Sequence, residues 1–104
     1  MKKIKLTCAH AIVKHLISQK ILINGKKEQL FAGVFGIFGH GNVACLGQAL
    51  QENQKDLPTW RGHHEQNMAL TGIAYARAKR RKQIFVATSS VGPGSTNMVT
   101  AAAV

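Results

Sequence analysis

The sequence predicts an α/β fold in which an open sheet of parallel strands is flanked by helices. Two uncharged and largely apolar segments, residues 33–38 and 83–88, are typical of strands buried on both faces of a sheet. Segments with apolar residues at helical spacing separate these strands, as the crossovers between parallel strands require. Polar loops that contain glycine or serine follow the expected strands at 39–42, 62–65 and 89–97. Because open α/β sheets bind ligands outside the carboxyl ends of their strands, these loops are the candidate site.

The N-terminal quarter of the chain predicts one helix and one hairpin. Thr7 can cap a helix that ends near Gln19, because a threonine hydroxyl accepts a bond from a free N–H group of the first turn. The apolar stripe expected on this helix consists of Ala11, Ile12, His15 and Leu16. Asn24-Gly25 lies between two short runs at 21–23 and 28–31, and this dipeptide is a strong signal for a tight hairpin.

The remainder of the chain alternates between helix and strand. We expect a helix at 43–53, a short strand at 59–61 and the longest helix from Glu65 to about Arg81. The long helix has small or branched residues on the side that would approach a sheet: Ala69, Gly72, Ile73 and Ala76. A final helix is expected to begin near Ser95 or Thr96.

These elements divide the chain into two expected parts. Residues 1–32 hold the first helix and a basic β-hairpin, and residues 33–104 hold part of an α/β domain. The last helix runs into an alanine-rich end that has no cap, glycine or proline to stop it. We therefore expect a truncated domain, the N-terminal fragment of a larger protein.

The charge of the chain is large but unevenly placed. The 104 residues include 14 Lys and Arg against 4 Asp and Glu, which gives a formal net charge of +10. Most of the cations lie in two blocks, residues 1–27 and 77–82, whereas residues 83–104 carry no charge and are expected to be buried. A net positive charge allows the alternative hypothesis of a small basic nucleic-acid-binding module. No aromatic residues alternate with the cations as a base-stacking surface would require, which argues against that hypothesis.

Other classes of protein fit the sequence poorly. The uncharged tail is long enough to cross a bilayer, but its Ser, Gly, Pro and Asn residues would be costly at that depth, so no membrane segment is expected. Cys8 and Cys45 are far apart and lack metal-ligand spacing, which favours reduced thiols in a cytoplasmic protein. No metal site is predicted, because the adjacent His63 and His64 point in different directions and no third ligand is suitably spaced.

Two residues are candidates for chemistry on their position alone. Glu65 opens the longest helix just after an expected strand, where the helix dipole stabilises a carboxylate. An ordinary first-turn glutamate remains the alternative. His40 lies in a glycine loop at a strand end, and an ordinary turn residue is again the alternative. Neither Gly39-His40-Gly41 nor Gly92-Pro93-Gly94 matches a phosphate-binding loop, because the further glycines or the Gly-Lys-Ser/Thr ending are missing.

Three segments carry a family resemblance when they are taken together. RGHHEQNMA at 61–69, GIAYAR at 72–77 and ATSSVGPGSTN at 87–97 occur in this order. They resemble the pyrimidine-binding domain of thiamine-diphosphate enzymes of the acetolactate-synthase type. Within that superfamily, the segment GIFGHGNV at 36–43 and the preceding basic hairpin resemble the trihydroxycyclohexane-1,2-dione hydrolase (decyclizing) family of myo-inositol catabolism.

The resemblance implies an enzyme and assigns roles to residues. The family's thiamine-diphosphate-dependent hydrolase cleaves a carbon–carbon bond and opens the ring of a polyol-derived dione to 5-deoxyglucuronate. By resemblance, Glu65 would bond to the aminopyrimidine of the cofactor and promote proton loss from the thiazolium ring. The residues that would shape the pyrimidine pocket are Gly92, Pro93, Gly94 and Asn97. His40 and Asn42 would lie near the substrate.

The resemblance also implies partners outside this sequence. Mg²⁺ and the diphosphate would be held by a C-terminal domain absent from these residues, and active sites would form between subunits of a homo-oligomer. We therefore expect the 104 residues alone to be inactive. A fragment of an acetolactate-synthase-like lyase or transferase remains the nearer alternative, and a nucleic-acid-binding module the more distant one.

Overall fold

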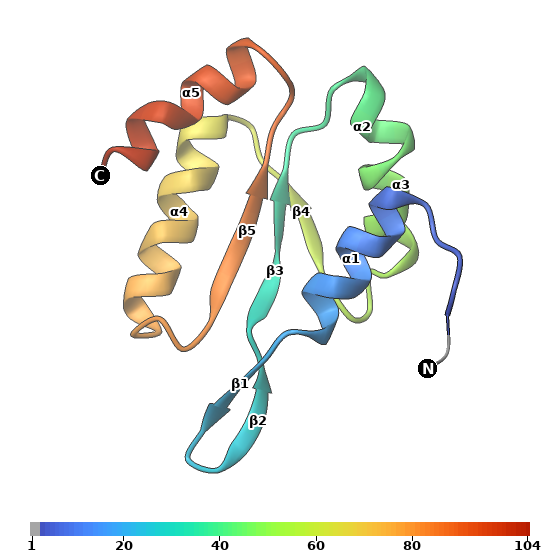
Figure 1. The fold of residues 1–104 in the computed structure, drawn as a ribbon. Coiled ribbons are helices and arrows are strands. Elements are labelled where there is room, and N and C mark those ends of the chain that lie inside the picture. The colour runs from blue at the N-terminus through green and yellow to red at the C-terminus, as the bar shows by residue number, and fades with distance from the viewer. Residues whose placement is uncertain (1–2) are drawn as a thin grey trace.

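The computed structural model describes residues 3–104 (Figure 1). Helices and strands follow one another along this part of the chain in the order α1 (Cys8–Ser18), β1 (Lys20–Ile23), β2 (Lys26–Gln29), β3 (Phe31–Gly36), α2 (His40–Ala44), α3 (Leu46–Glu52), β4 (Thr59–Arg61), α4 (Glu65–Ala78), β5 (Ile84–Thr88) and α5 (Pro93–Ala102). No helix in the described range is long and apolar enough to span a membrane.

The central element of the fold is β3, which pairs in parallel with β4 on one side and β5 on the other. Val34 lies opposite Thr59 of β4 and opposite Val86 of β5. The β3–β5 register shifts by one residue between Phe31 and Gly33. A parallel sheet flanked by helices is the fold class that the sequence predicts, and the structure confirms it.

Each face of this sheet packs against different helices. On one face, Val34 forms a buried core with Val13 of α1, Leu50 of α3 and Leu57. On the other face, the rings of Phe35, Phe85 and Trp60 pack together, and Tyr75 of α4 meets Phe85 edge to face. Figure 1 shows α4 and α5 on the β5 side of the sheet and α1, α2 and α3 on the other side. The side chains of β3 thus join two layers of helices into one unit.

The N-terminal helix begins as predicted but buries a different face. The Thr7 hydroxyl accepts a hydrogen bond from the His10 amide at 3.2 Å and caps α1. The predicted stripe is wrong for three of its four residues, because Ile12 is 47% exposed and Ala11 and His15 are also exposed, whereas Leu16 does pack against the core. The buried side is formed by Ala9, Val13, Leu16 and Ile17, which follow the i, i+4, i+7, i+8 spacing of an amphipathic helix.

A second contact holds α1 against α3. His10 Nε2 lies 2.6 Å from Glu52 Oε2. The hydrogen bonds from His10 and Gln48 to the Glu52 carboxylate lower the pKa of Glu52 from its usual 4.5. This pair is solvent-exposed and therefore supplements, rather than replaces, the apolar contacts around Val13.

The hairpin forms at Asn24-Gly25, as predicted. Asn24 and Gly25 both have positive φ, 51° and 79°, which a two-residue type I′ turn requires. The strands pair antiparallel from Lys20–Gln29 to Ile23–Lys26. The second strand ends at Gln29 and not at residue 31 as predicted, because Phe31 already belongs to β3.

The hairpin also brings the two basic blocks of the sequence together. Gln83 receives a 2.5 Å hydrogen bond from the Tyr75 hydroxyl and donates one of 3.2 Å to the Gln29 carbonyl, which joins the hairpin to the turn between α4 and β5. Lys79 and Lys82 of that turn line the same cavity as Glu28 of the hairpin. We call this end of the sheet the basic edge, defined by Lys20, Lys26, Lys27, Lys79, Arg80, Arg81 and Lys82.

Three predicted helix boundaries differ from the structure. The helix expected at 43–53 is two helices, which begin at His40 and Leu46 and are separated at Cys45 (φ −107°, ψ −81°). The loop expected at 39–42 is therefore already helical from His40. The longest helix ends at Ala78, because Arg80 and Arg81 adopt left-handed conformations. The last helix begins at Pro93, a residue favoured in the first helical turn because it lacks the N–H group that would stay unbonded there.

Burial of the uncharged tail is also less than predicted. Strand β5 is partly buried along its length, and Ala101 is fully buried. However, Val91 is 88% exposed and Val99 is 63% exposed, so most of α5 faces outward in this chain. The proposed division near residue 32 stays a prediction, since Val13 and Val34 share one core.

Candidate active site

The site is built at the end of the sheet where β3, β4 and β5 terminate, which we call the carboxyl edge (residues 37–40, 62–65 and 89–97). Glu65 is the first residue of α4 and follows β4 after a short turn. Gly62 shapes this turn, because a Cβ there would overlap the buried side chain of Met68. His64, in the N-cap position, makes no side-chain cap, so a carboxylate at the first turn is the group that complements the helix dipole.

The loop after β5 provides the other wall of the site. Gly92 has φ 76° and ψ −117°, a backbone conformation that favours glycine, and it directs the chain into α5. The Thr96 hydroxyl donates to the Gly92 carbonyl at 3.0 Å, and the Ser95 hydroxyl donates to the Ser90 carbonyl at 2.9 Å. These bonds give the loop a defined shape in front of Glu65.

The two walls meet at the Glu65 carboxylate. Asn97 Nδ2 donates a hydrogen bond to Glu65 Oε2 at 3.4 Å. Gly94 is buried, and a Cβ on it would lie 3.0 Å from Glu65 Oε1. The structure therefore brings together Glu65, Gly94 and Asn97, three of the residues singled out in the sequence.

The other candidate residues lie further from this carboxylate. Gly92 and Pro93 are exposed at the start of α5. His40 is the first residue of α2 and lines an open cavity of about 410 Å³ with Phe38, Gly39, Val43 and Ser90. Asn42 is exposed on α2 and does not line that cavity. Within residues 3–104, no hydrogen bond joins His40 or Asn42 to Glu65.

One residue of the site escaped the sequence analysis. Ser90 lines the His40 cavity, and its Oγ also lies close to the place that a Cβ on Gly94 would take. Its position between the end of a strand and Gly92-Pro93-Gly94 was the available signal. Sequence alone does not show that this loop reaches across to the loop after β3.

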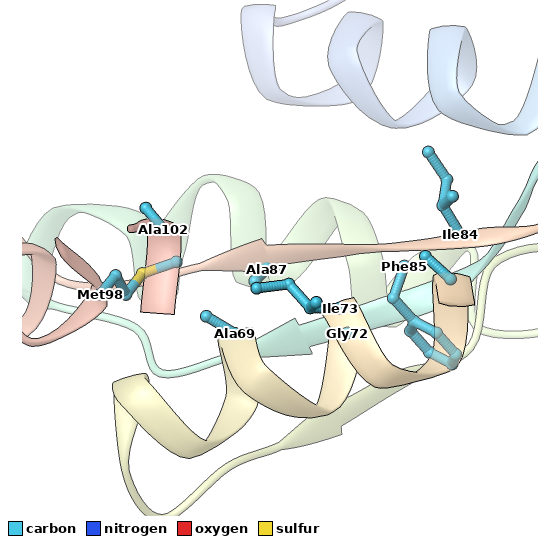
Figure 2. Close-up of a pocket in the computed structure, with 9 residues that line it drawn as sticks. Ala69, Gly72, Ile73, Ile84, Phe85, Ala87, Met98 and Ala102 are labelled. Atoms are coloured by element: carbon cyan, nitrogen blue, oxygen red, sulfur yellow. The ribbon is translucent and has the colours of Figure 1, made fainter. Parts of the chain in front are cut away.

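Two further cavities near the sheet lack the same combination of groups. Figure 2 shows a pocket of about 330 Å³ between α4, β5 and α5. All of its side chains are apolar, among them Ile73, Phe85 and Met98, so it offers no group that could exchange a proton. A cavity of about 210 Å³ beside the β4–α4 turn is lined by Arg61, His63 and His64, among others, but does not include Glu65.

Metal ligands are not gathered in this structure. Among the described residues, no group of three or more His, Cys, Asp or Glu side chains is placed to hold a metal ion. Cys8 and Cys45 are free and exposed thiols.

Comparison with known proteins gives the class to which this fold and site belong. Residues 19–104 match the family described as thiamine pyrophosphate enzyme, N-terminal TPP binding domain. The chain belongs to this family. Thiamine pyrophosphate, also called thiamine diphosphate, is thus the cofactor associated with the domain.

Individual relatives narrow the class further. The chain is 53% identical to a 3D-(3,5/4)-trihydroxycyclohexane-1,2-dione hydrolase of Geobacillus thermodenitrificans, over 99% of this chain and 16% of that protein. Proteins of the same name from Clostridium tetani and Bacillus thuringiensis are each 50% identical over the same shares. The chain therefore spans about 16% of the length of these relatives. No solved structure gave a significant match.

Proposed function

We propose that this chain is the N-terminal part of a thiamine-diphosphate-dependent hydrolase that opens the ring of trihydroxycyclohexane-1,2-dione to give 5-deoxyglucuronate. The substrate is suggested by the names of relatives that are 50–53% identical over nearly the whole chain. The structural observation that carries the proposal is the Glu65 carboxylate, held at the head of α4 and hydrogen-bonded by Asn97.

The residues at the carboxyl edge fit the aminopyrimidine part of the cofactor. A nitrogen heterocycle offers N–H groups and ring nitrogens, and a carboxylate is a strong acceptor for such groups. Because Gly94 has no side chain, the start of α5 packs directly beside Glu65 Oε1, and a Cβ there would crowd this carboxylate oxygen. Glu65 would bind the ring, Asn97 would fix the carboxylate, and Gly92, Pro93 and Gly94 would form the wall beside it.

When bound, thiamine diphosphate supplies the carbon nucleophile and the electron sink that carbon–carbon bond cleavage needs. The role of Glu65 is to hold and release a proton at a ring nitrogen, as a general acid–base group. Asn97 is a positioning residue, because its amide donates to Glu65 Oε2, whereas Oε1 accepts no hydrogen bond from residues 3–104. His40 and Asn42 would contact the substrate from α2.

Other parts of the proposal rest on the family resemblance. Mg²⁺ and the diphosphate would be bound by residues outside this chain. The active site would lie between subunits of a homo-oligomer, and the protein would be cytoplasmic. An acetolactate-synthase-like activity is the nearer alternative, whereas a nucleic-acid-binding module has no support from the relatives.

The proposal is tested by turnover in the full-length protein. With thiamine diphosphate and Mg²⁺ supplied, the native protein should consume trihydroxycyclohexane-1,2-dione and release 5-deoxyglucuronate, measured by liquid chromatography. Glu65→Gln should lower kcat by roughly 10²- to 10⁴-fold, because an amide cannot exchange the proton. Its circular dichroism spectrum should be unchanged.

Glu28→Gln is the matched control. It makes the same chemical change on β2, at the opposite end of the sheet, and should leave kcat as it is. Release of acetolactate from pyruvate without consumption of the dione would favour the alternative activity. Full activity of Glu65→Gln would remove Glu65 from the mechanism.

A further inference from the structure

Two loops of the carboxyl edge, far apart in the sequence, touch at Ser90. A Cβ on Gly39, after β3, would lie 3.1 Å from the Cβ of Ser90, after β5. The open cavity of about 410 Å³ beside this contact is lined by Phe38, Gly39, His40, Val43 and Ser90. Ser90 is thus the point at which the β5 loop enters the wall of the His40 cavity.

Ser90 also adjoins the cofactor-binding groups. Its Oγ and Glu65 Oε1 both lie within 3.0 Å of the place that a Cβ on Gly94 would occupy. The Ser90 side chain therefore stands between the His40 cavity and the Glu65 carboxylate. A ligand that fills the His40 cavity would touch this side chain.

The hydroxyls of Ser89 and Ser90 are used differently. Ser89 Oγ donates to the Ser90 carbonyl and also bonds to Ser95 Oγ, each at 3.2 Å, so its hydrogen-bonding partners lie within the loop. Ser90 Oγ makes no hydrogen bond to any part of the chain from residue 3 to residue 104. Ser90 lines the cavity, and its hydroxyl, which packs beside Gly94 and lacks a protein partner, becomes available to a ligand there by rotation about χ1.

The lining of the cavity indicates what kind of ligand it suits. Its polar side chains are the Ser90 hydroxyl and the His40 imidazole, and no Lys, Arg, Asp or Glu lines it. An anionic 2-keto acid would find no charged partner there, whereas an uncharged ring with several hydroxyl groups would find donors and acceptors. The cavity volume also lies in the range usual for small-molecule sites.

We infer that Ser90 is a substrate-binding residue, whose hydroxyl bonds to a ring hydroxyl of an uncharged polyhydroxylated dione and so selects that substrate class. The inference rests on the proposed function and extends it to a residue and a specificity. Ser90 contributes binding and selection only, since Glu65 carries the proton chemistry.

The test compares two substrates in the full-length protein with thiamine diphosphate and Mg²⁺. Ser90→Ala should raise KM for trihydroxycyclohexane-1,2-dione by roughly 3- to 10-fold with kcat little changed, as expected for one lost neutral hydrogen bond. The kcat/KM for cyclohexane-1,2-dione, which lacks the hydroxyls, should not change. The Kd for thiamine diphosphate should also stay the same.

Two comparisons guard against a merely structural effect. Ser89→Ala removes the neighbouring hydroxyl, which bonds within the loop, and should leave the preference between the two diones unchanged. Ser90→Thr and Ser90→Val have nearly the same shape, so only the valine variant should lose that preference.

The outcomes separate the two proposals. If the native protein consumes the dione but Ser90→Ala and Ser90→Val keep the native KM and preference, the role of Ser90 is overturned and the proposed function stands. If the native protein does not consume the dione, both fail. An equal loss on both diones would assign Ser90 a structural role and would also overturn the inference.

Discussion

The two ends of the sheet differ in charge, in backbone conformation and in the groups they expose. The carboxyl edge holds one carboxylate, Glu65, together with an amide, hydroxyl groups and a glycine whose missing side chain allows these groups to pack closely. The basic edge holds seven Lys and Arg side chains, all exposed. At the carboxyl edge, polar groups are positioned by contacts with one another. At the basic edge, the charged side chains are exposed to solvent. Half of the 14 Lys and Arg residues thus lie at the edge opposite the candidate site, so the net charge of +10 says little about the site itself.

Among the predictions that compare the two ends of the sheet, the largest effect is expected from the addition of one methyl group at the carboxyl edge. Gly94→Ala should weaken thiamine diphosphate binding by about tenfold or more, equivalent to about 1.4 kcal/mol, because the new Cβ must displace Ser90 Oγ and Glu65 Oε1. Titration of the full-length protein with the cofactor measures this. Gly72→Ala is the control, since its Cβ would meet only Phe85 at an ordinary 3.9 Å. Equal Kd values for both variants would show that the close contact of Gly94 with Ser90 and Glu65 does not matter for cofactor binding.

A smaller effect, of opposite sign, is expected at the basic edge. Arg81 has φ 62°, a conformation that costs a non-glycine residue about 1–2 kcal/mol. Arg81→Gly relieves that cost but loses backbone entropy, so the free energy of unfolding should rise by at most about 1 kcal/mol. Urea unfolding measures it, and kcat should not change.

Arg77→Gly supplies the matched control for this edge. Arg77 lies in the last turn of α4, where glycine should lower the free energy of unfolding by about 1 kcal/mol. If Arg81→Gly destabilises the protein as much as Arg77→Gly does, the left-handed turn is not strained. If it lowers kcat, the two edges are not independent.

The smallest effect is expected between the edges, at the contact of α1 with α3. The pKa of Glu52 is lowered, so its carboxylate stabilises the folded state above pH 4.5, and this contribution disappears as the pH falls below that value. Glu52→Gln should therefore reduce the pH dependence of the urea midpoint between pH 7 and pH 3. His10→Gln should act in the same direction, because it removes the partner at 2.6 Å. An unchanged pH dependence in both variants would show that the pair is not formed in solution.

Local signals in the sequence predict much of this structure. Asn24-Gly25, the Thr7 cap and the two apolar core strands each have a distinct signature, and each forms, although the strand expected at 33–38 spans Phe31–Gly36. The prediction that the longest helix begins at Glu65 is also confirmed. The turn after Ala78 could not be predicted, because Lys and Arg are good helix formers and the left-handed residues are arginines.

Other features depend on contacts between distant segments. The break at Cys45 has no proline or glycine at that residue to mark it. The buried side of α1 is fixed by where α3 and β3 lie, and a helix with several apolar residues offers more than one candidate stripe. Of the site, Glu65 was accessible from the sequence, whereas the meeting of Ser90 with Gly39 depends on two loops brought together by the β3–β5 pairing.

The central position of β3 also orders the events of folding. The hairpin joins residues close in sequence and can form within about 1–10 μs. The pairing of Phe31 with Ile84 joins opposite halves of the chain, so it must first overcome the entropy of closing a long loop. Ser90 meets the Gly39 loop only after this step. The wall that joins the Gly39 loop to Ser90 is therefore among the last parts of the candidate site to form, because it waits until β5 has joined the sheet.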